Sequence, residues 1–208
     1  IVEFNDGTRF IVTDLEDFYH ASMCHEPKTL TFILKCLRGG GVFIDVGANI
    51  GGYAIRVAKT ARVYAFEPHP RNFHLLTLNI KLNRGINRVV AFQAAANSYV
   101  GKTKLFISDF HGRHSLTTGV KGECKSIEVN AITLDSILID EDRINVIKID
   151  VEGAEPLVLK GAENILKKTE IVILEATTSS FSLASKILAK HSFRPINKLD
   201  NVNVVFDK

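Results

Sequence analysis

A continuous apolar segment that runs into a glycine-rich turn constrains this chain more than any other feature. Residues 42–46, Val-Phe-Ile-Asp-Val, have the pattern of a strand buried on both faces, interrupted only by Asp45. Residues 47–51, Gly-Ala-Asn-Ile-Gly, follow directly and lead into a helical pattern over residues 51–59. Such a strand, turn and helix predict a parallel α/β sheet, in which ligands bind beyond the carboxyl ends of the strands.

Strand and helix patterns alternate through the rest of the chain. Two short strands around the turn Leu199-Asp-Asn-Val202 predict a terminal antiparallel hairpin. We therefore expect an α/β fold with a Rossmann-like doubly wound sheet, mostly parallel and ending in that hairpin. The expected strands cover residues 62–66, 88–93, 144–149, 170–174, 194–197 and 202–206, and the expected helices cover 69–82, 156–168 (interrupted near Gly161) and 181–191.

Two segments depart from this alternation. Residues 1–40 combine a short hairpin signal with two amphipathic pieces, and they predict a cap segment ahead of the main domain, residues 41–208. Residues 96–131 are rich in glycine and in β-forming residues. They predict an inserted hairpin with strands near 104–107 and 126–129 and a flexible tip at 109–116.

Composition narrows the class of protein. With 208 residues, 46% hydrophobic and 24% charged, the chain has enough apolar content for one core. The net charge of +3 and the absence of basic runs make nucleic acid an unlikely partner, and no apolar stretch approaches the ~18 residues of a membrane span. Three scattered cysteines argue against a disulfide framework or a zinc site, which favours a cytoplasmic location. The oligomeric state is not encoded in any pattern that we recognise.

The turn after the first strand indicates which cofactor to expect. A dinucleotide fingerprint needs a glycine where Asn49 stands, and no G-x-x-x-x-G-K-[ST] motif occurs in the chain. Pyrophosphate and triphosphate ligands are therefore disfavoured, which leaves S-adenosylmethionine, a nucleoside with an amino-acid tail. The candidate cofactor-binding residues are Asp45, Gly47, Ala48, Asn49, Gly51, Glu67, Pro68, Ala95 and Asp150.

Glu67 has the clearest expected role among these residues. It ends the second strand about twenty residues after Gly47, where a carboxylate can accept hydrogen bonds from both ribose hydroxyls. The alternative is an exposed acid without a function. Asp45 likewise either contributes to the cofactor site or accepts hydrogen bonds from loop amides.

The segment Lys148-Ile-Asp-Val-Glu-Gly-Ala-Glu155 contains the candidate catalytic residues. In a doubly wound sheet Asp150 would lie beside Asp45, facing the reactive end of the cofactor. Asp150 could instead cap the turn into the following helix. Glu152 could likewise have no catalytic role and do no more than stabilise the positive end of that helix. His114, in the insertion, is the competing candidate for a general base, ahead of His111. The spacing of these residues requires no metal.

Taken together, these motifs resemble the FkbM family of S-adenosylmethionine-dependent methyltransferases, which have the class I methyltransferase fold. The matching segments are residues 43–51, 63–68, 79–83, 133–137, 146–155 and 158–161, with Ser115-Leu116 ahead of Thr133-Leu-Asp135. The resemblance implies O-methylation of a hydroxyl on a sugar, a glycan or another small molecule.

Two alternatives stay open from the sequence. Segments 66–69 and 79–83 are also similar to archaeal tRNA-guanine methyltransferases, although Gln93-Ala-Ala-Ala96 lacks the acidic residue usual after the third strand in those enzymes. The chain could also bind S-adenosylmethionine without catalysis and regulate a partner.

Overall fold

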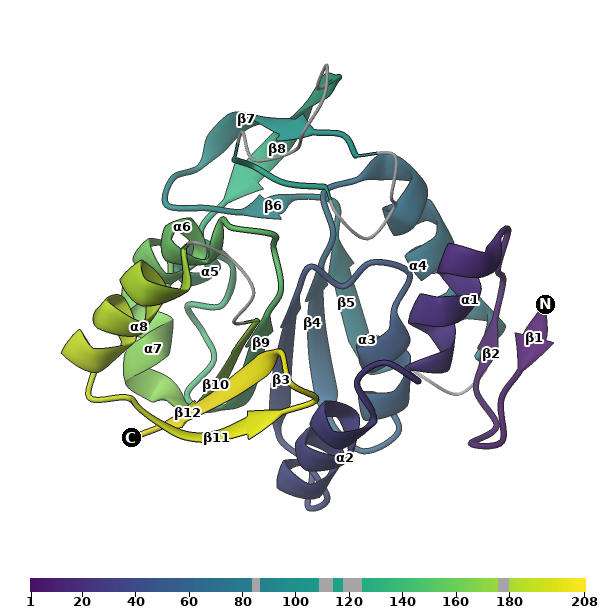
Figure 1. Ribbon diagram of the computed structural model, residues 1–208, viewed down its shortest axis with the longest axis horizontal. Coiled ribbons are helices and arrows are strands. Elements are labelled where there is room, and N and C mark those ends of the chain that lie inside the picture. The colour runs from purple at the N-terminus through teal and green to yellow at the C-terminus, as the bar shows by residue number, and fades with distance from the viewer. Residues whose placement is uncertain (84–86, 109–113, 118–124, 176–179) are drawn as a thin grey trace.

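A seven-stranded sheet in the order β11-β12-β10-β9-β3-β4-β5 forms the middle of the molecule (Figure 1). The computed structural model describes residues 1–83, 87–108, 114–117, 125–175 and 180–208. The strands of this sheet are β3 (Val42–Val46), β4 (Arg62–Phe66), β5 (Val89–Phe92), β9 (Ile144–Ile149), β10 (Thr169–Glu175), β11 (Arg194–Leu199) and β12 (Asn203–Asp207).

The direction of the strands confirms the expected topology. Strands β5, β4, β3, β9 and β10 run parallel, whereas β12 runs antiparallel to both β10 and β11. The chain moves outward from β3 to β5 and then returns to place β9 on the other side of β3. At this switch point the Asp150 N–H donates to the Val46 carbonyl oxygen over 3.0 Å, so the ends of β3 and β9 lie side by side where α/β sheets bind ligands.

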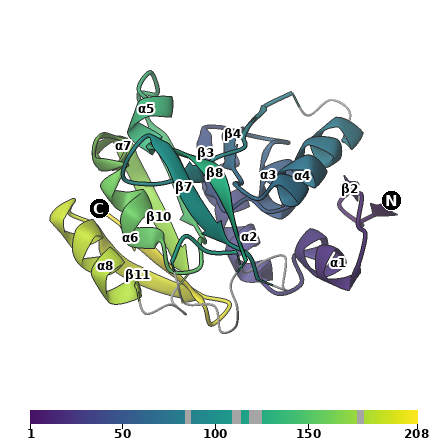
Figure 2. The same cartoon turned by 90° about the horizontal axis from the view of Figure 1, so that it is seen from above.

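Helices cover both faces of the sheet (Figures 1 and 2). Successive residues of a strand face opposite sides. Phe43 accordingly packs in the cluster that includes Ala54, while Ile44 packs in the cluster that includes Val158. One layer contains α2 (Pro27–Cys36), α3 (Gly52–Val57) and α4 (Pro70–Leu82); the other contains α5 (Leu134–Ile137), α6 (Glu155–Lys160), α7 (Glu163–Lys168) and α8 (Phe181–Lys190). None of the helices in the described residues is long and apolar enough to cross a membrane.

The expected interruption near Gly161 is confirmed and has a steric cause. A Cβ atom at Gly161 would lie 1.9 Å from the Asn97 carbonyl oxygen, so only glycine allows the end of α6 to approach that backbone. The helical region consequently divides into α6 and α7 at this position.

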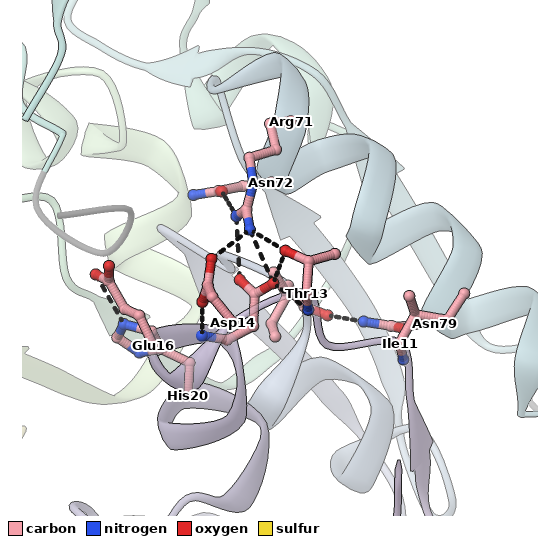
Figure 3. Close-up of polar contacts among 10 residues, drawn as sticks. Ile11, Thr13, Asp14, Glu16, His20, Arg71, Asn72 and Asn79 are labelled. Carbon is pink, nitrogen blue, oxygen red and sulfur yellow. Dashed lines mark hydrogen bonds and ion pairs between the residues drawn. The ribbon is translucent and has the colours of Figure 1, made fainter. Parts of the chain in front are cut away.

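The N-terminal segment is held on α4 by polar side chains (Figure 3). It consists of the strands β1 (Val2–Glu3) and β2 (Arg9–Phe10) followed by α1 (Leu15–Ser22). Asn79 Oδ1 accepts the Ile11 N–H over 2.7 Å, and the Arg71 guanidinium contacts both oxygens of the buried Asp17 carboxylate at 3.0 and 2.8 Å. These contacts give the Asn79 motif a structural role, because they dock α1 at the ligand end of the sheet.

The insertion forms a separate three-stranded sheet, which lies above the main sheet in Figure 1. It contains β6 (Ala95–Ala96), β7 (Gly101–Phe106) and β8 (Ser126–Ile132), which confirms the two expected strands and extends them. Ser115 Oγ donates to the Glu152 carbonyl oxygen over 2.7 Å, so this part of the insertion is fixed to the turn after β9. Residues 109–113 of the expected tip, His111 among them, lie outside the described residues.

Candidate active site

A cavity of about 990 Å³ opens at the carboxyl ends of β3, β4 and β9. Its volume lies at the upper end of the usual ~300–1,000 Å³ for small-molecule sites. Three walls surround it: the turns after β3 and β4, the N-terminal segment, and the insertion together with the turn after β9. Of the candidate residues, the lining includes Gly47, Ala48, Asn49, Glu67, Pro68, Ala95, His114, Asp150 and Glu152.

The two glycines of the turn after β3 serve different purposes. Gly47 has φ +87°, and a Cβ atom there would lie 1.9 Å from the Asp150 carbonyl oxygen. Gly51 has φ +98°, but it does not line the cavity, and its Cβ would meet the side chains of Leu76 and Ile55. Gly51 is thus required by packing against α4 and within α3.

Glu67 lies where β4 ends and is 5% exposed. Its carboxylate accepts the Asn49 N–H and the His69 N–H, each over 2.9 Å, and so connects the two turns that form this wall. Burial raises the pKa of Glu67 to about 7, although the two backbone donors oppose the shift. A carboxylate held in this way still has lone pairs that can accept ligand hydroxyls.

Asp45 lies beneath the cavity and does not line it. It is 2% exposed, and its Oδ2 atom has no hydrogen-bond partner within the described segments. Burial raises the pKa of Asp45 to about 7, and the negative charge of Asp150 adds to that shift. In this position Asp45 can influence the cofactor loop through its charge, but it does not face the ligand space.

An apolar slot follows β5. It is lined by Ala94, Ala95 and Ala96 together with Phe66, whose ring stacks on Phe92 at 4.9 Å. Leu105 and Leu116 of the insertion complete it. Sequence analysis identified only Ala95 and its neighbours, because the insertion leucines come from a different part of the chain.

Lys148 is a buried cation that the sequence motif contained without an assigned role. Its side chain is 2% exposed, and Nζ lies 2.7 Å from Asp150 Oδ2 and 3.7 Å from Glu26 Oε2. Burial lowers the pKa of Lys148, but Asp150 and Glu26 outweigh burial and the net shift is upward. A lysine within a strand buried on both faces must be paired, and that rule could have drawn attention to it.

Glu26, between α1 and α2, completes this network. The Tyr53 hydroxyl donates to Glu26 Oε2, and Asn203 Nδ2 donates to Glu26 Oε1 over 2.9 Å. Four segments distant in sequence therefore converge on one buried ion pair. No local pattern around Glu26 distinguishes it from an ordinary residue ahead of a helix.

Three carboxylates lie together beside Lys148. One oxygen from each of Asp150, Glu152 and Glu175 lies within 4.8 Å of the others, a spacing that could accommodate a divalent cation. Lys148 keeps the pKa of Asp150 below its ordinary value despite burial. Burial and the charge of Asp150 raise the pKa of Glu175 to about 8. The cluster therefore holds a proton on Glu175 near neutral pH.

His114 faces the same cavity from the insertion. Its Nδ1 atom accepts the Ser108 N–H over 3.1 Å, and its ring stacks on His69 at 4.1 Å. A neutral ring that accepts at Nδ1 bears its proton on Nε2. In this tautomer His114 can donate a hydrogen bond to a ligand.

The N-terminal wall contains aromatic residues to which the sequence assigned no role. Tyr19 and His25 stack at 4.3 Å, and His20 lies edge-on to His25 at 5.6 Å. All three line the same cavity as Glu67. Tyr19 and His20 belong to the amphipathic helix α1, and His25 follows it, so the sequence could not distinguish a cavity wall from an ordinary packed face.

Solved structures similar to this chain include methyltransferases with the class I fold. The chain is similar to the FkbM methyltransferase of Methylobacillus flagellatus KT, with TM-score 0.56 and 18% identity over 82% of this chain and 44% of that one. It is also similar to Aeropyrum pernix fibrillarin, solved with natively bound S-adenosyl-L-methionine, with TM-score 0.51 and 9% identity over 81% of this chain and 66% of that one. The fold is therefore the Rossmann-like fold of class I methyltransferases.

The sequence comparison is more specific. The model of the methyltransferase FkbM domain matches residues 45–195. The hexuronic acid methyltransferase AglP of Haloferax volcanii is 31% identical over 174 residues, which cover 81% of this chain and 70% of that protein. The chain belongs to the FkbM methyltransferase family.

Proposed function

We propose that this chain transfers a methyl group from S-adenosylmethionine to a hydroxyl oxygen of a sugar. The observation that carries the proposal is the position of Glu67, a buried carboxylate that joins the two cofactor turns and lines a cavity of suitable size. The family membership supports the methyl donor. The name of the relative from Haloferax volcanii supports a sugar as acceptor.

The cavity walls fit the proposed cofactor. Glu67 would accept the ribose hydroxyls, the slot formed by Ala94–Ala96 and Leu116 would hold the adenine, and the turn at 47–49 would contact the amino-acid tail. When bound, S-adenosylmethionine supplies an electrophilic methyl group on a sulfonium. Lys148 is the only lysine or arginine among the described lining residues, which suits a ligand without phosphate.

The remaining walls favour a hydroxyl-rich acceptor over a polyanion. Tyr19 and His25 offer a stacked pair of rings, and carboxylates with vacant lone pairs can accept sugar hydroxyls. RNA is disfavoured because its phosphates would meet acidic side chains. The acidic residues of the lining are Glu16, Glu26, Glu67, Asp150, Glu152, Glu175 and Asp200.

The chain contributes to the reaction mainly through positioning. Asp150, kept ionised by Lys148, can accept a hydrogen bond from the acceptor hydroxyl and orient its oxygen. The insertion, fixed by Ser115 to the turn after β9, limits the access of water from that side. His114 can donate a hydrogen bond to the acceptor from its Nε2 atom.

Transfer of a tritiated methyl group from S-adenosylmethionine tests this proposal. The acceptors are glycosides of neutral hexoses, glycosides of hexuronic acids, and bulk tRNA. We expect label on a sugar in a product that resists alkali, since an ether survives alkali and a methyl ester does not. Label on tRNA alone would contradict the proposal. So would the absence of label from all three acceptors in a protein that binds S-adenosylhomocysteine tightly. Release of label by alkali would move the acceptor atom to a carboxylate.

A further inference from the structure

His20 lines the cavity, as does Asp150 after β9. It belongs to α1, which contributes Glu16, Tyr19 and His20 to the lining. A Cβ atom at Gly52 would lie 2.7 Å from the His20 carbonyl oxygen, so the absence of a side chain there lets α1 contact the first turn of α3. This contact fixes His20 beside the cofactor turn.

A neighbouring carboxylate defines the protonation of the ring. His20 Nε2 lies 3.8 Å from Glu16 Oε1, one helical turn away (Figure 3). A carboxylate on the side of Nε2 favours a proton on that nitrogen, and this tautomer has Nδ1 as its acceptor. Burial lowers the pKa of His20 below its ordinary 6.5, although Glu16, Asp150 and Asp17 oppose this shift. Burial therefore favours the neutral form of the ring.

The other candidate bases in the cavity are less suitable. Lys148 holds the Asp150 carboxylate in an ion pair, which makes it a weak proton acceptor. Glu175 already bears a proton near neutral pH. His114 uses Nδ1 to accept a backbone N–H. His20 alone among these combines a neutral ring with an orienting carboxylate on the wall of the cavity.

We propose that His20 is the general base that accepts the proton of the acceptor hydroxyl, oriented by Glu16. This inference rests on the proposed function. As the bond forms between the hydroxyl oxygen and the methyl carbon, the bond between that carbon and sulfur breaks and its electron pair stays on sulfur. The hydroxyl proton passes to His20 Nδ1 and leaves to solvent after the product departs. The charged and titratable groups around His20 are Glu16 and Asp17 of α1, His25 of the following turn, and Asp150 just after β9.

The test compares His20→Asn with His74→Asn, which changes an exposed histidine of α4 away from the cavity. We expect His20→Asn to lower kcat by about a hundredfold or more, with KM and S-adenosylhomocysteine affinity within about threefold. The fall of wild-type kcat at low pH, as His20 becomes protonated, should disappear in His20→Asn. His74→Asn should retain both the rate and the pH profile.

A second measurement does not depend on turnover. Long-range nitrogen–proton NMR spectra of histidine-labelled protein with S-adenosylhomocysteine should show His20 as the Nε2–H tautomer with a pKa below 6.5. An Nδ1–H tautomer, or wild-type kcat in His20→Asn, would overturn the role of His20. A metal could instead activate the hydroxyl at the carboxylate cluster. In that case a chelator should abolish the activity of the wild-type protein, and magnesium should restore the full wild-type rate in His20→Asn. This result would also overturn the role of His20. Failure of the wild-type protein to bind S-adenosylhomocysteine would instead overturn the proposed function.

Discussion

The two sides of the cavity are built in different ways. The cofactor side consists of backbone turns after β3 and β4, joined by Glu67 through amide hydrogen bonds. The opposite side consists of side chains from α1, the segment before α2, and the ends of β9 and β12, joined through Glu26, Lys148 and Asn203. The comparison teaches that a site formed by local turns can be recognised from a short motif, whereas a site formed by distant side chains cannot.

The largest effect is expected from a glycine of the turn after β3, because this side of the cavity depends on close backbone contacts. Gly47→Ala should lower the free energy of unfolding by about 4 kcal/mol, from left-handed strain and from collision with the Asp150 carbonyl. Gly7→Ala is the matched control, because Gly7 has φ +76° but open space around its Cβ, and it should cost about 1 kcal/mol. Urea denaturation measures both values. Equal losses in the two variants would show that the close approach at Gly47 is unimportant.

The attachment of the N-terminal wall depends on Arg71. Arg71→Met should destabilise the protein by about 2 kcal/mol, since it leaves the Asp17 carboxylate, 1% exposed, without its cation. Arg9→Met, which removes the exposed pair with Glu3, should cost less than about 0.5 kcal/mol. Adding Asp17→Asn to Arg71→Met should restore part of the loss. If Arg71→Met is as mild as Arg9→Met, the wall is held by apolar packing alone.

The buried Asp45 carboxylate beneath the cofactor side should make the stability of the protein depend on pH. Its pKa rises on folding from 3.8 to about 7, so its contribution to stability is complete below pH 4 and is lost as the pH rises through 7. Asp45→Asn should therefore be more stable than the wild type at pH 8, by about 1 to 2 kcal/mol, and should lose this advantage at pH 4. The exposed Asp140→Asn should show no such difference. A destabilised Asp45→Asn at pH 8 would mean that the charge of Lys148 and the Ala54 N–H outweigh the burial of the carboxylate.

Prediction from sequence succeeded where the signal was local. The apolar strand 42–46, the turn after it and the alternation of strands and helices gave the sheet topology, because each depends on neighbouring residues. Gly51 was expected to approach a ligand but packs against Leu76 and Ile55, since a glycine motif does not state which neighbour is close. Glu26 had no local signal, because its importance depends on its contact across the fold with Lys148. His20 likewise had none, because its place in the cavity depends on how α1 packs.

Binding of S-adenosylhomocysteine, measured by calorimetry, tests the central claim most directly. We expect the wild-type protein to bind it with a micromolar Kd and to show no binding of NAD. Glu67→Ala should weaken binding by about 5- to 150-fold, the effect of losing about 1 to 3 kcal/mol of hydrogen bonds to a charged acceptor. Two results would contradict the claim. One is that Glu67→Ala binds S-adenosylhomocysteine as tightly as the wild type does. The other is that the wild-type protein binds NAD tightly and does not bind S-adenosylhomocysteine.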